Sequence, residues 1–241
     1  MISDNLLAVQ ARIEAACEQA RRPAHDVMLL AVSKTFGADA VQAAFNAGQT
    51  AFGENYIQEA VQKIAALQHL PIVWHCIGPI QSNKTKLVAE NFDWVHSVDR
   101  LKIAERLNDQ RPAHLAPLQV CIQINIDGEA SKSGVAPADV EVLAAQVARL
   151  PRLALRGLMC IPENTPNLIA SCATFTRAKA LFDHINASKL PISPKINSEV
   201  KFVTLDTLSM GMTADLEAAI ACGSTMVRVG TAIFGARSKP A

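Results

Sequence analysis

The chain has 241 residues, half of them hydrophobic, which suits one large α/β domain with a sizeable core and excludes a disordered protein. Its 23 basic and 22 acidic side chains nearly cancel, so no overall field attracts nucleic acid or an anionic membrane. The apolar runs are much shorter than the ~20 residues of a membrane helix, and the N-terminus lacks a signal-peptide pattern, so we expect a cytoplasmic protein with a small-molecule ligand.

The cysteines and histidines show no metal-ligand spacing. The six cysteines form no CxxC pair and lie mostly within apolar segments, which predicts buried, reduced thiols. The six histidines are scattered, without the HxH or HxxxH spacing of metal sites. We therefore expect neither disulfides nor a bound metal.

A helical pattern opens the chain, and short β-type runs then alternate with helical segments almost to its end. The opening helix has apolar residues three or four positions apart, at Leu6, Val9, Ile13, Ala16 and Ala20. Eight runs rich in β-branched and other apolar residues follow, and each predicts a strand. In chain order they are Val27–Lys34, Ala51–Gly53, Ile72–Ile77, Trp94–Ser97, Leu118–Ile126, Leu155–Ile161, Thr204–Ser209 and Met226–Val229.

Amphipathic helices are predicted between these strands. One carries an apolar stripe that starts at Ile57, and another has Pro137 in its first turn. Parallel strands need helical crossovers, and about eight such units in fewer than ~250 residues favour a closed barrel over an open doubly wound sheet. No Gly/Ser/Pro-rich linker divides the chain. We therefore predict a single domain over residues 1–241, a (β/α)₈ TIM barrel with an extra N-terminal helix.

Lys34 ends the first predicted strand, just before a helical segment. Burial disfavours the ammonium form, so a lysine at the rim of a barrel can be neutral enough to attack an aldehyde and form a Schiff base. Position alone does not decide this, because most lysines at strand ends are solvated. Lys34 is thus a candidate covalent residue whose role depends on its neighbours.

Small-residue loops follow the last two predicted strands, where (β/α)₈ barrels often hold a phosphate. After the seventh strand, Ser209, Met210 and Gly211 offer a hydroxyl and a backbone that can approach an anion. After the eighth, Gly230 and Thr231 open a short helix whose free N–H groups favour negative charge. Each motif alone is ordinary turn chemistry. Their joint placement predicts a phosphate site at the mouth of the barrel.

Three polar residues at strand ends each allow two interpretations. Arg228 lies in an otherwise apolar strand and forms either a salt bridge, which the pattern favours, or a fixed donor toward a ligand's ring nitrogen. Asn55 either caps the next helix, the simpler interpretation, or contacts a ligand. His96 is either a hydrogen-bonded structural histidine, which is favoured, or a residue that faces the mouth.

Five segments, taken together and in this order, resemble the pyridoxal-phosphate homeostasis protein family. They are Ala31-Val32-Ser33-Lys34, Phe52-Gly53-Glu54-Asn55-Tyr56, His75 to Lys84, Leu208 to Met212 and Val227 to Gly235. The match spans nearly the whole chain. Cys76 departs from the pattern, because an aromatic residue is commoner there in relatives. The resemblance implies a single (β/α)₈ barrel similar to the N-terminal domain of alanine racemase.

The resemblance also implies pyridoxal 5′-phosphate (PLP) as the cofactor. Lys34 would carry it as a Schiff base, and Arg228 would face the pyridine nitrogen. An arginine does not readily protonate the ring as a carboxylate partner does, so the cofactor would be a poorer electron sink. The residues implied to contact PLP are Lys34, Asn55, Ser209, Met210, Gly211, Arg228, Gly230 and Thr231, with Ser209, Gly211, Gly230 and Thr231 at the phosphate.

We predict a monomeric PLP-binding protein without robust catalytic activity. It would buffer PLP or deliver it to apo PLP-dependent enzymes, and so influence amino-acid pools. Racemisation needs a proton acceptor and a donor on opposite faces, and we expect no opposing base because the one tyrosine, Tyr56, follows the second strand and the chain ends soon after the eighth. Two alternatives stay open: a PLP-dependent racemase or lyase of narrow specificity, and a Schiff-base aldolase that acts on a phosphorylated sugar without PLP.

Overall fold

The computed structural model describes residues 1–128, 133–162, 168–191 and 202–236. Within them, parallel strands close into a barrel in the order β1 to β8, with β8 beside β1. The closed barrel confirms the predicted fold class. The strands are β1 Met28–Val32, β2 Ala51–Glu54, β3 Val73–Cys76, β4 Trp94–Val98, β5 Leu118–Ile124, β6 Leu153–Cys160, β7 Thr207–Ser209 and β8 Met226–Val229.

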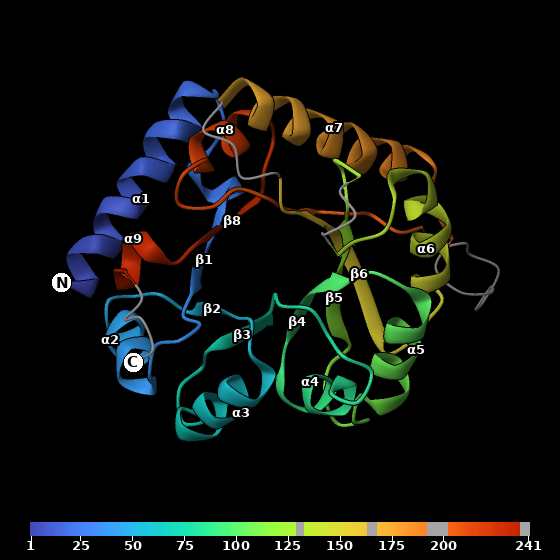
Figure 1. Ribbon diagram of the computed structural model, residues 1–241, viewed down its shortest axis with the longest axis horizontal. Helices are drawn as coiled ribbons and strands as arrows, with labels where there is room; N and C mark the ends of the chain where they lie inside the picture. Colours follow the sequence, from blue (N-terminus) through green and yellow to red (C-terminus); the bar gives the residue numbers. More distant parts are fainter. Residues whose placement is uncertain (129–132, 163–167, 192–201, 237–241) are drawn as a thin grey trace.

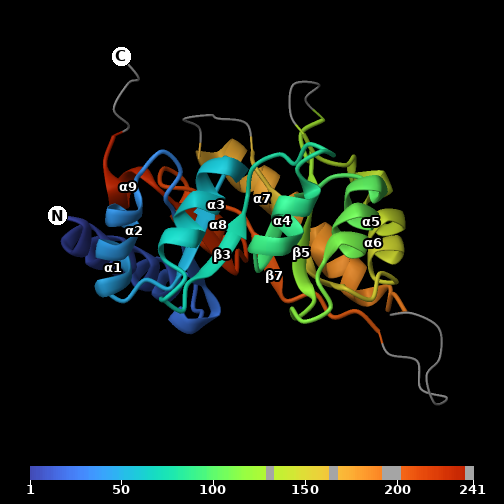
Figure 2. The same ribbon diagram turned by 90° about the horizontal axis from the view of Figure 1, so that it is seen from below.

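Helices cover the outside of this barrel, as Figures 1 and 2 show. The predicted extra N-terminal helix is α1, which buries Leu6, Val9 and Ile13 and packs against α2, α8 and α9. The helices are α1 Ile2–Gln19, α2 Ala38–Asn46, α3 Ile57–Ala66, α4 Thr85–Asn91, α5 Leu101–Gln110, α6 Val140–Val147, α7 Leu168–Ala187, α8 Leu216–Ala221 and α9 Thr231–Phe234, with 3₁₀ turns η1 Ala24–Asp26 and η2 Pro137–Asp139. Pro137 therefore lies in η2, before α6.

Several strand ends differ from the predicted ones. β1 ends at Val32, and the predicted terminal residue Lys34 lies in the turn that follows. The Ser33 N–H still donates to the Gly53 carbonyl (3.0 Å), but the Phe36 N–H then bonds back to the Ser33 carbonyl (3.1 Å) and closes the turn. Apolar character alone does not mark where the ladder of hydrogen bonds stops. For the same reason β7 begins at Thr207, later than predicted.

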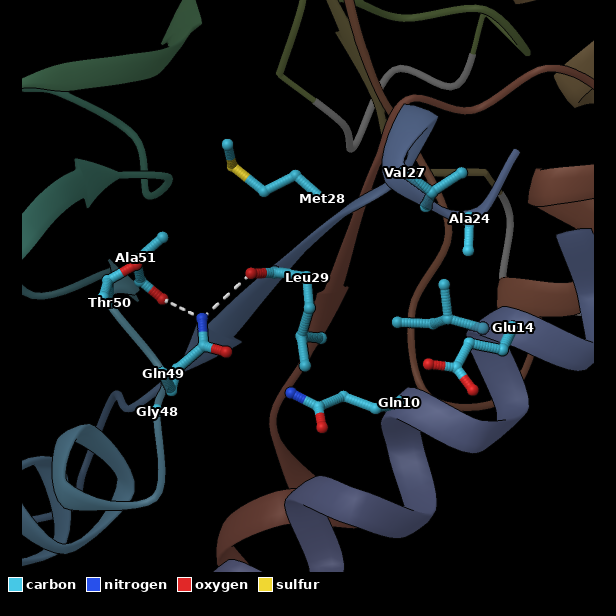
Figure 3. A pocket seen from close by; sticks show the side chains of 11 residues that line it. Gln10, Glu14, Ala24, Val27, Met28, Leu29, Gly48, Gln49, Thr50 and Ala51 are labelled. Atoms are coloured by element: carbon cyan, nitrogen blue, oxygen red, sulfur yellow. Dashed lines mark hydrogen bonds between the residues drawn. The ribbon is translucent and has the colours of Figure 1, made fainter. Parts of the chain in front are cut away.

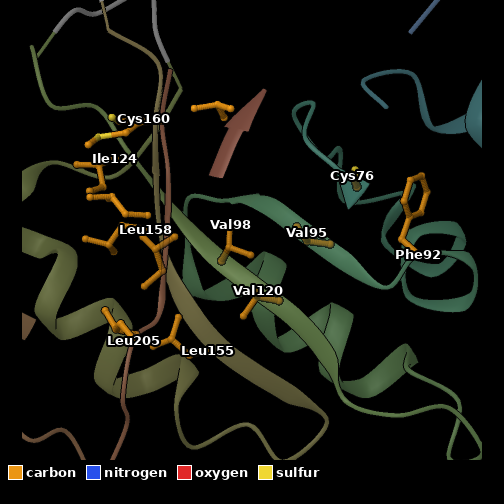
Figure 4. Packing of buried hydrophobic residues seen from close by; sticks show 14 of the residues in the cluster. Cys76, Phe92, Val95, Val98, Val120, Ile124, Leu155, Leu158, Cys160 and Leu205 are labelled. Carbon is orange, nitrogen blue, oxygen red and sulfur yellow. The ribbon is translucent and has the colours of Figure 1, made fainter. Parts of the chain in front are cut away.

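Alternation along the strands separates an outer core from the barrel interior. On β8, Val227 and Val229 belong to the large cluster between strands and helices, part of which Figure 4 shows around β4 to β6. Met226 instead packs with Leu30 and Ala51 in a small separate cluster. Because side chains alternate between the two faces of a strand, Arg228 shares the inward face with Met226. The barrel interior therefore contains the charged Arg228 on the carboxyl side of the apolar cluster of Leu30, Ala51 and Met226.

Within the described residues, no helix combines the length and apolar character that crossing a membrane requires. All six cysteines are free thiols; four are buried, and Cys172 and Cys222 are partly exposed.

Candidate functional site

Two of the cavities lie at opposite ends of the barrel. A cavity of about 510 Å³ lies at the amino ends of β1 and β2 beside α1, where the Gln49 Nε2 donates to the carbonyls of Leu29 (2.9 Å) and Ala51 (2.7 Å), as Figure 3 shows. A smaller one, about 250 Å³, lies at the carboxyl ends of the strands. Chemistry in these barrels occurs at the carboxyl ends, so we take the smaller cavity as marking the functional mouth. It is lined by Asn55, Ile77, Pro79, Gln123, Ile124, Asn125, Ser133 and Ile161.

Lys34 is half-buried in the turn after β1, at the same end of the barrel, but it does not line this cavity. β1 and β8 are paired, with Leu30 opposite Arg228. A Cβ at Gly230 would stand 3.0 Å from the Val32 carbonyl oxygen, so a side chain there would crowd the end of β1. The barrel closure thus brings Lys34 and the Gly230 loop to the same part of the rim.

The loop after β7 is fixed against β8. Gly211 has φ +92°, which favours glycine, and a Cβ there would lie 2.5 Å from the Ala219 Cβ. Its carbonyl accepts a hydrogen bond from the Arg228 N–H (2.9 Å). The Met210 side chain is fully buried in the outer core, so only its backbone can reach the mouth. Both predicted phosphate loops therefore lie side by side.

Arg228 is held inside the barrel by oxygens of two neighbouring strands. Its Nη1 donates to the Ser209 carbonyl (2.7 Å) and hydroxyl (2.8 Å), and its Nη2 donates to the Cys160 carbonyl (2.9 Å). Burial lowers the pKa of this guanidinium. Among the described residues no carboxylate pairs with it, so the salt bridge that the pattern favoured is wrong. What remains is a buried cation in a fixed orientation.

A chain of hydrogen bonds continues from Ser209 into the barrel. The Ser209 Oγ lies 3.0 Å from the His96 Nδ1, and the His96 Nε2 lies 2.9 Å from the His75 Nδ1. His75 stacks on Trp94, with ring centroids 5.2 Å apart. Burial lowers the pKa of His75 to about 3, and burial together with the neighbouring His75 and Arg228 lowers that of His96 well below its usual value. Both imidazoles are therefore neutral.

These hydrogen bonds also assign the tautomers of His96 and His75. The Ser209 hydroxyl accepts from Arg228, and its own proton satisfies the His96 Nδ1. The His96 Nε2–H then donates to the His75 Nδ1, which leaves the proton of His75 on Nε2. Within the described residues this buried nitrogen has no hydrogen-bond partner. The reverse arrangement would leave the serine proton unsatisfied as well. His96 is thus a hydrogen-bonded structural histidine, the interpretation that the sequence favours. The sequence analysis assigns no role to its partner His75, although His75 lies on a neighbouring predicted strand.

Asn55 is not a helix cap. α3 begins at Ile57, its N-cap residue is Tyr56, and no side chain caps it. The Asn55 Oδ1 is instead buried without a hydrogen-bond partner among the described residues, and the residue lines the mouth cavity. A Cβ at Gly78 would lie 2.3 Å from the Asn55 carbonyl oxygen, so the glycine allows the loop after β3 to close against it. The site thus contains an acceptor that lacks a donor.

A buried charged cluster on the outer side of β1 and β2 was also not anticipated. Lys63 on α3 is 5% exposed and contacts both Glu54, which is fully buried, and Glu59. The sequence contains one indication of this cluster, because Lys63 lies three residues after Ala60 on the buried face of the predicted helix. A lysine there needs a partner inside.

Comparison with known proteins agrees with this geometry. Residues 5–238 match the family model described as alanine racemase, N-terminal domain. Pyridoxal phosphate homeostasis proteins of Pseudomonas aeruginosa and Pasteurella multocida are 55% identical over 236 residues and 53% over 238, covering 98% of this chain and 96% and 97% of their own. The solved structure of PipY from Synechococcus elongatus with PLP bound has a TM-score of 0.81 and 34% identity, and covers 98% of this chain and 100% of its own. The chain therefore belongs to the pyridoxal phosphate homeostasis proteins, within the family of the alanine racemase N-terminal domain.

Proposed function

We propose that this chain binds PLP at the carboxyl end of the barrel and buffers or delivers it without robust catalytic turnover. One observation carries the proposal: Lys34, Arg228 and the loops at Gly211 and Gly230 converge where β8 lies between β1 and β7. An amine, a fixed cation and two small-residue loops are the groups that an aldehyde, a ring nitrogen and a phosphate require. The names of the relatives and the PLP-bound PipY structure support the same cofactor.

The residues present fit PLP, with one change of role. The Ser209 hydroxyl is already engaged by Arg228 and His96, so we assign it to holding the guanidinium in place. The phosphate would then be bound by the backbone at Gly211 and Gly230 and by Thr231. Asn55 offers its buried, unpaired Oδ1 to a donor group of the ligand. Met210 would contribute its backbone alone.

The chemistry of the site favours retention of the cofactor over turnover. Bound PLP supplies an aldehyde and an electron-withdrawing ring. Lys34 would hold this aldehyde as a Schiff base. Arg228 would face the ring nitrogen and keep its own proton, because a guanidinium stays charged in proteins. A ring nitrogen without a proton withdraws electrons poorly, which disfavours racemisation and related reactions.

We also propose that the protein works as a monomer in the cytoplasm. Its exposed large hydrophobic side chains are on different elements, for example Leu7 on α1, Val142 on α6 and Ile161 after β6, which is the scattered arrangement usual for monomers. Free thiols are typical of a reducing compartment. Sedimentation equilibrium with and without PLP checks the first point, and a dimer mass would contradict it.

Covalent trapping tests the cofactor assignment. After incubation with PLP and reduction with borohydride, peptide mapping should locate the pyridoxyl group on Lys34, and the yellow absorbance should be lost in Lys34→Ala. Lys86→Ala is the matched control, because Lys86 is an exposed lysine on α4. An absence of adduct in the wild-type chain, or an unchanged adduct in Lys34→Ala, would contradict the proposal.

A transfer experiment tests delivery. PLP-loaded protein is mixed with an apo PLP-dependent enzyme, and recovery of that enzyme's activity is compared with recovery in free PLP. Delivery predicts reactivation faster than the spontaneous release of PLP, whereas buffering alone predicts a rate equal to release. In a parallel sample in D₂O, rapid Lys34-dependent exchange at Cα of an amino acid would favour the racemase alternative instead.

A further inference from the structure

The two residues that flank Lys34 are both held by one charged cluster outside the barrel. We name the side chains of Glu54, Glu59 and Lys63 the outer clamp. The Lys63 Nζ donates to the Ser33 carbonyl (2.8 Å) and the Glu54 Oε1 (2.7 Å), and forms an ion pair with the Glu59 Oε1 (2.6 Å). The ammonium thus has two hydrogen-bond acceptors and a second carboxylate beside it. One of these acceptors is the backbone carbonyl directly before Lys34.

The residue after Lys34 adopts a backbone conformation that needs support. Thr35 has φ +70°, in the left-handed region, which is unfavourable for a β-branched residue. Its N–H donates to the Glu59 Oε1 (2.8 Å), the same oxygen that contacts Lys63. On the other side of Lys34, the Ser33 Oγ donates to the Glu54 Oε1 (2.6 Å). The outer clamp therefore fixes the peptide on both sides of Lys34.

Stability alone does not account for the outer clamp. Lys63 is 5% exposed and Glu54 is fully buried, and the Glu54 Oε2 has no hydrogen-bond partner in the part of the chain that the structure describes. Burial raises the pKa of Glu54, and the contacts with Lys63 oppose this shift. Replacing such a buried pair with apolar residues is often neutral or stabilising, so the pair is weak evidence for a stabilising role. Its contacts are concentrated instead on the segment that presents Lys34.

We propose that Lys63, together with Glu54 and Glu59, is a positioning residue for Lys34. Alternation on β1 places Leu30 inside the barrel and Ala31 in the outer core, so Ser33 continues outward toward α3 while Lys34 continues inward. The outer clamp holds Ser33 and Thr35 from outside and leaves the Lys34 amine aimed at the mouth. This inference rests on the proposed PLP site, because the amine must meet an aldehyde carbon held by the phosphate loops.

The test separates binding of the phosphate moiety from formation of the C=N bond. Wild-type protein, Lys63→Met and Lys63→Met/Glu54→Gln are compared, with Lys86→Met as the control at an exposed lysine. In the single variant the buried Glu54 carboxylate loses its lysine partner, which destabilises the fold. The double variant replaces this carboxylate with a neutral amide and so keeps the fold, but it does not restore the hydrogen bond from Lys63 to the Ser33 carbonyl. Binding is measured with pyridoxine 5′-phosphate, which lacks the aldehyde, and linkage is measured as the rate of borohydride-trapped pyridoxyl-Lys34.

Both clamp variants should link PLP at least about tenfold more slowly, while their affinity for pyridoxine 5′-phosphate stays within about twofold of wild type. In the apo protein, hydrogen exchange of the peptide containing residues 33–36 should be faster than in Lys86→Met. Wild-type linkage by the double variant, or an equal loss of analogue binding and linkage, would overturn the inference. If wild type itself forms no pyridoxyl-Lys34, the PLP proposal fails, while the exchange rates still decide whether the outer clamp holds the segment.

Discussion

At the scale of single residues, the site depends on how a buried cation is kept in one orientation. Arg228 is 4% exposed and its hydrogen bonds go to two carbonyls and one hydroxyl. Neutral acceptors hold the guanidinium without neutralising it, so its charge stays available to a ligand. Ser209 links this cation to the neutral His96, which accepts a hydrogen bond from the serine hydroxyl. The serine hydroxyl therefore couples the orientation of Arg228 to the position of His96 inside the barrel.

Ser209→Ala should therefore disturb Arg228 more than the loss of one surface hydroxyl would. The substitution leaves the Arg228 Nη1 with the Ser209 carbonyl alone and removes the donor to His96, and one unsatisfied buried group costs about 1–3 kcal/mol. Urea denaturation should show a loss of this size, and the absorbance maximum of bound PLP should shift. Ser3→Ala, at an exposed serine of α1, is the control. Equal stability of the two variants would contradict this role of Ser209.

At the scale of secondary-structure elements, the mouth depends on strands and loops that pack without side chains between them. Gly157 on β6 is paired with Thr207 on β7, and a Cβ at this glycine would lie 1.6 Å from the Thr207 carbonyl oxygen. No rotamer change relieves an overlap with backbone. Because β7 has only three residues and carries Ser209, the contact with Gly157 determines where Ser209 meets Arg228.

Gly157→Ala should consequently shift β7 or prevent folding. We expect a loss of about 3 kcal/mol in the free energy of unfolding, typical of severe overpacking, together with weaker PLP binding. Gly37→Ala is a matched control, because a Cβ there would meet only the movable Asp39 carboxylate at 2.4 Å. Urea denaturation and PLP titration of both variants check the expectation, which a stable, PLP-binding Gly157→Ala protein would refute.

At the scale of the whole molecule, the buried imidazoles make folding sensitive to acid. The pKa of His75 falls to about 3 in the folded protein, from an ordinary value of 6.5, and that of His96 is also lowered. Below pH 6.5 the unfolded chain therefore binds protons that the folded chain does not, so stability is full above this pH and falls as the pH decreases toward 3. Glu54 acts in the opposite sense, because its raised pKa lets the folded state take up a proton first.

Lowering the pH from 7.5 to 5.5 should cost about 1.4 kcal/mol of stability for each of the two imidazoles. Urea denaturation at several pH values measures this slope. His75→Phe, which preserves a ring against Trp94, should reduce the slope by about half even though it lowers stability at every pH. A wild-type slope near zero between these pH values would contradict the neutral assignment.

Much of the architecture and the position of the proposed site can be inferred from the sequence. The alternation of β-type and helical patterns determines a (β/α)₈ barrel, because local periodicity reports which face of each element is buried. The order of the strands then places residues 209–211 and 228–231 beside the end of β1. Lys34 could be singled out for the same reason, although its strand ends at Val32.

The partners of individual polar groups were decided only by the tertiary structure. Arg228 bonds to Ser209 and Cys160 in place of a carboxylate, and Lys63 bonds to Ser33, thirty positions away in the chain. Periodicity specifies which face of an element is buried, but it carries no information on which distant donor and acceptor meet once the barrel closes. The sequence by itself therefore determined the barrel and the end at which Lys34 lies, whereas the closed barrel determined which atoms hold that lysine and Arg228 in place.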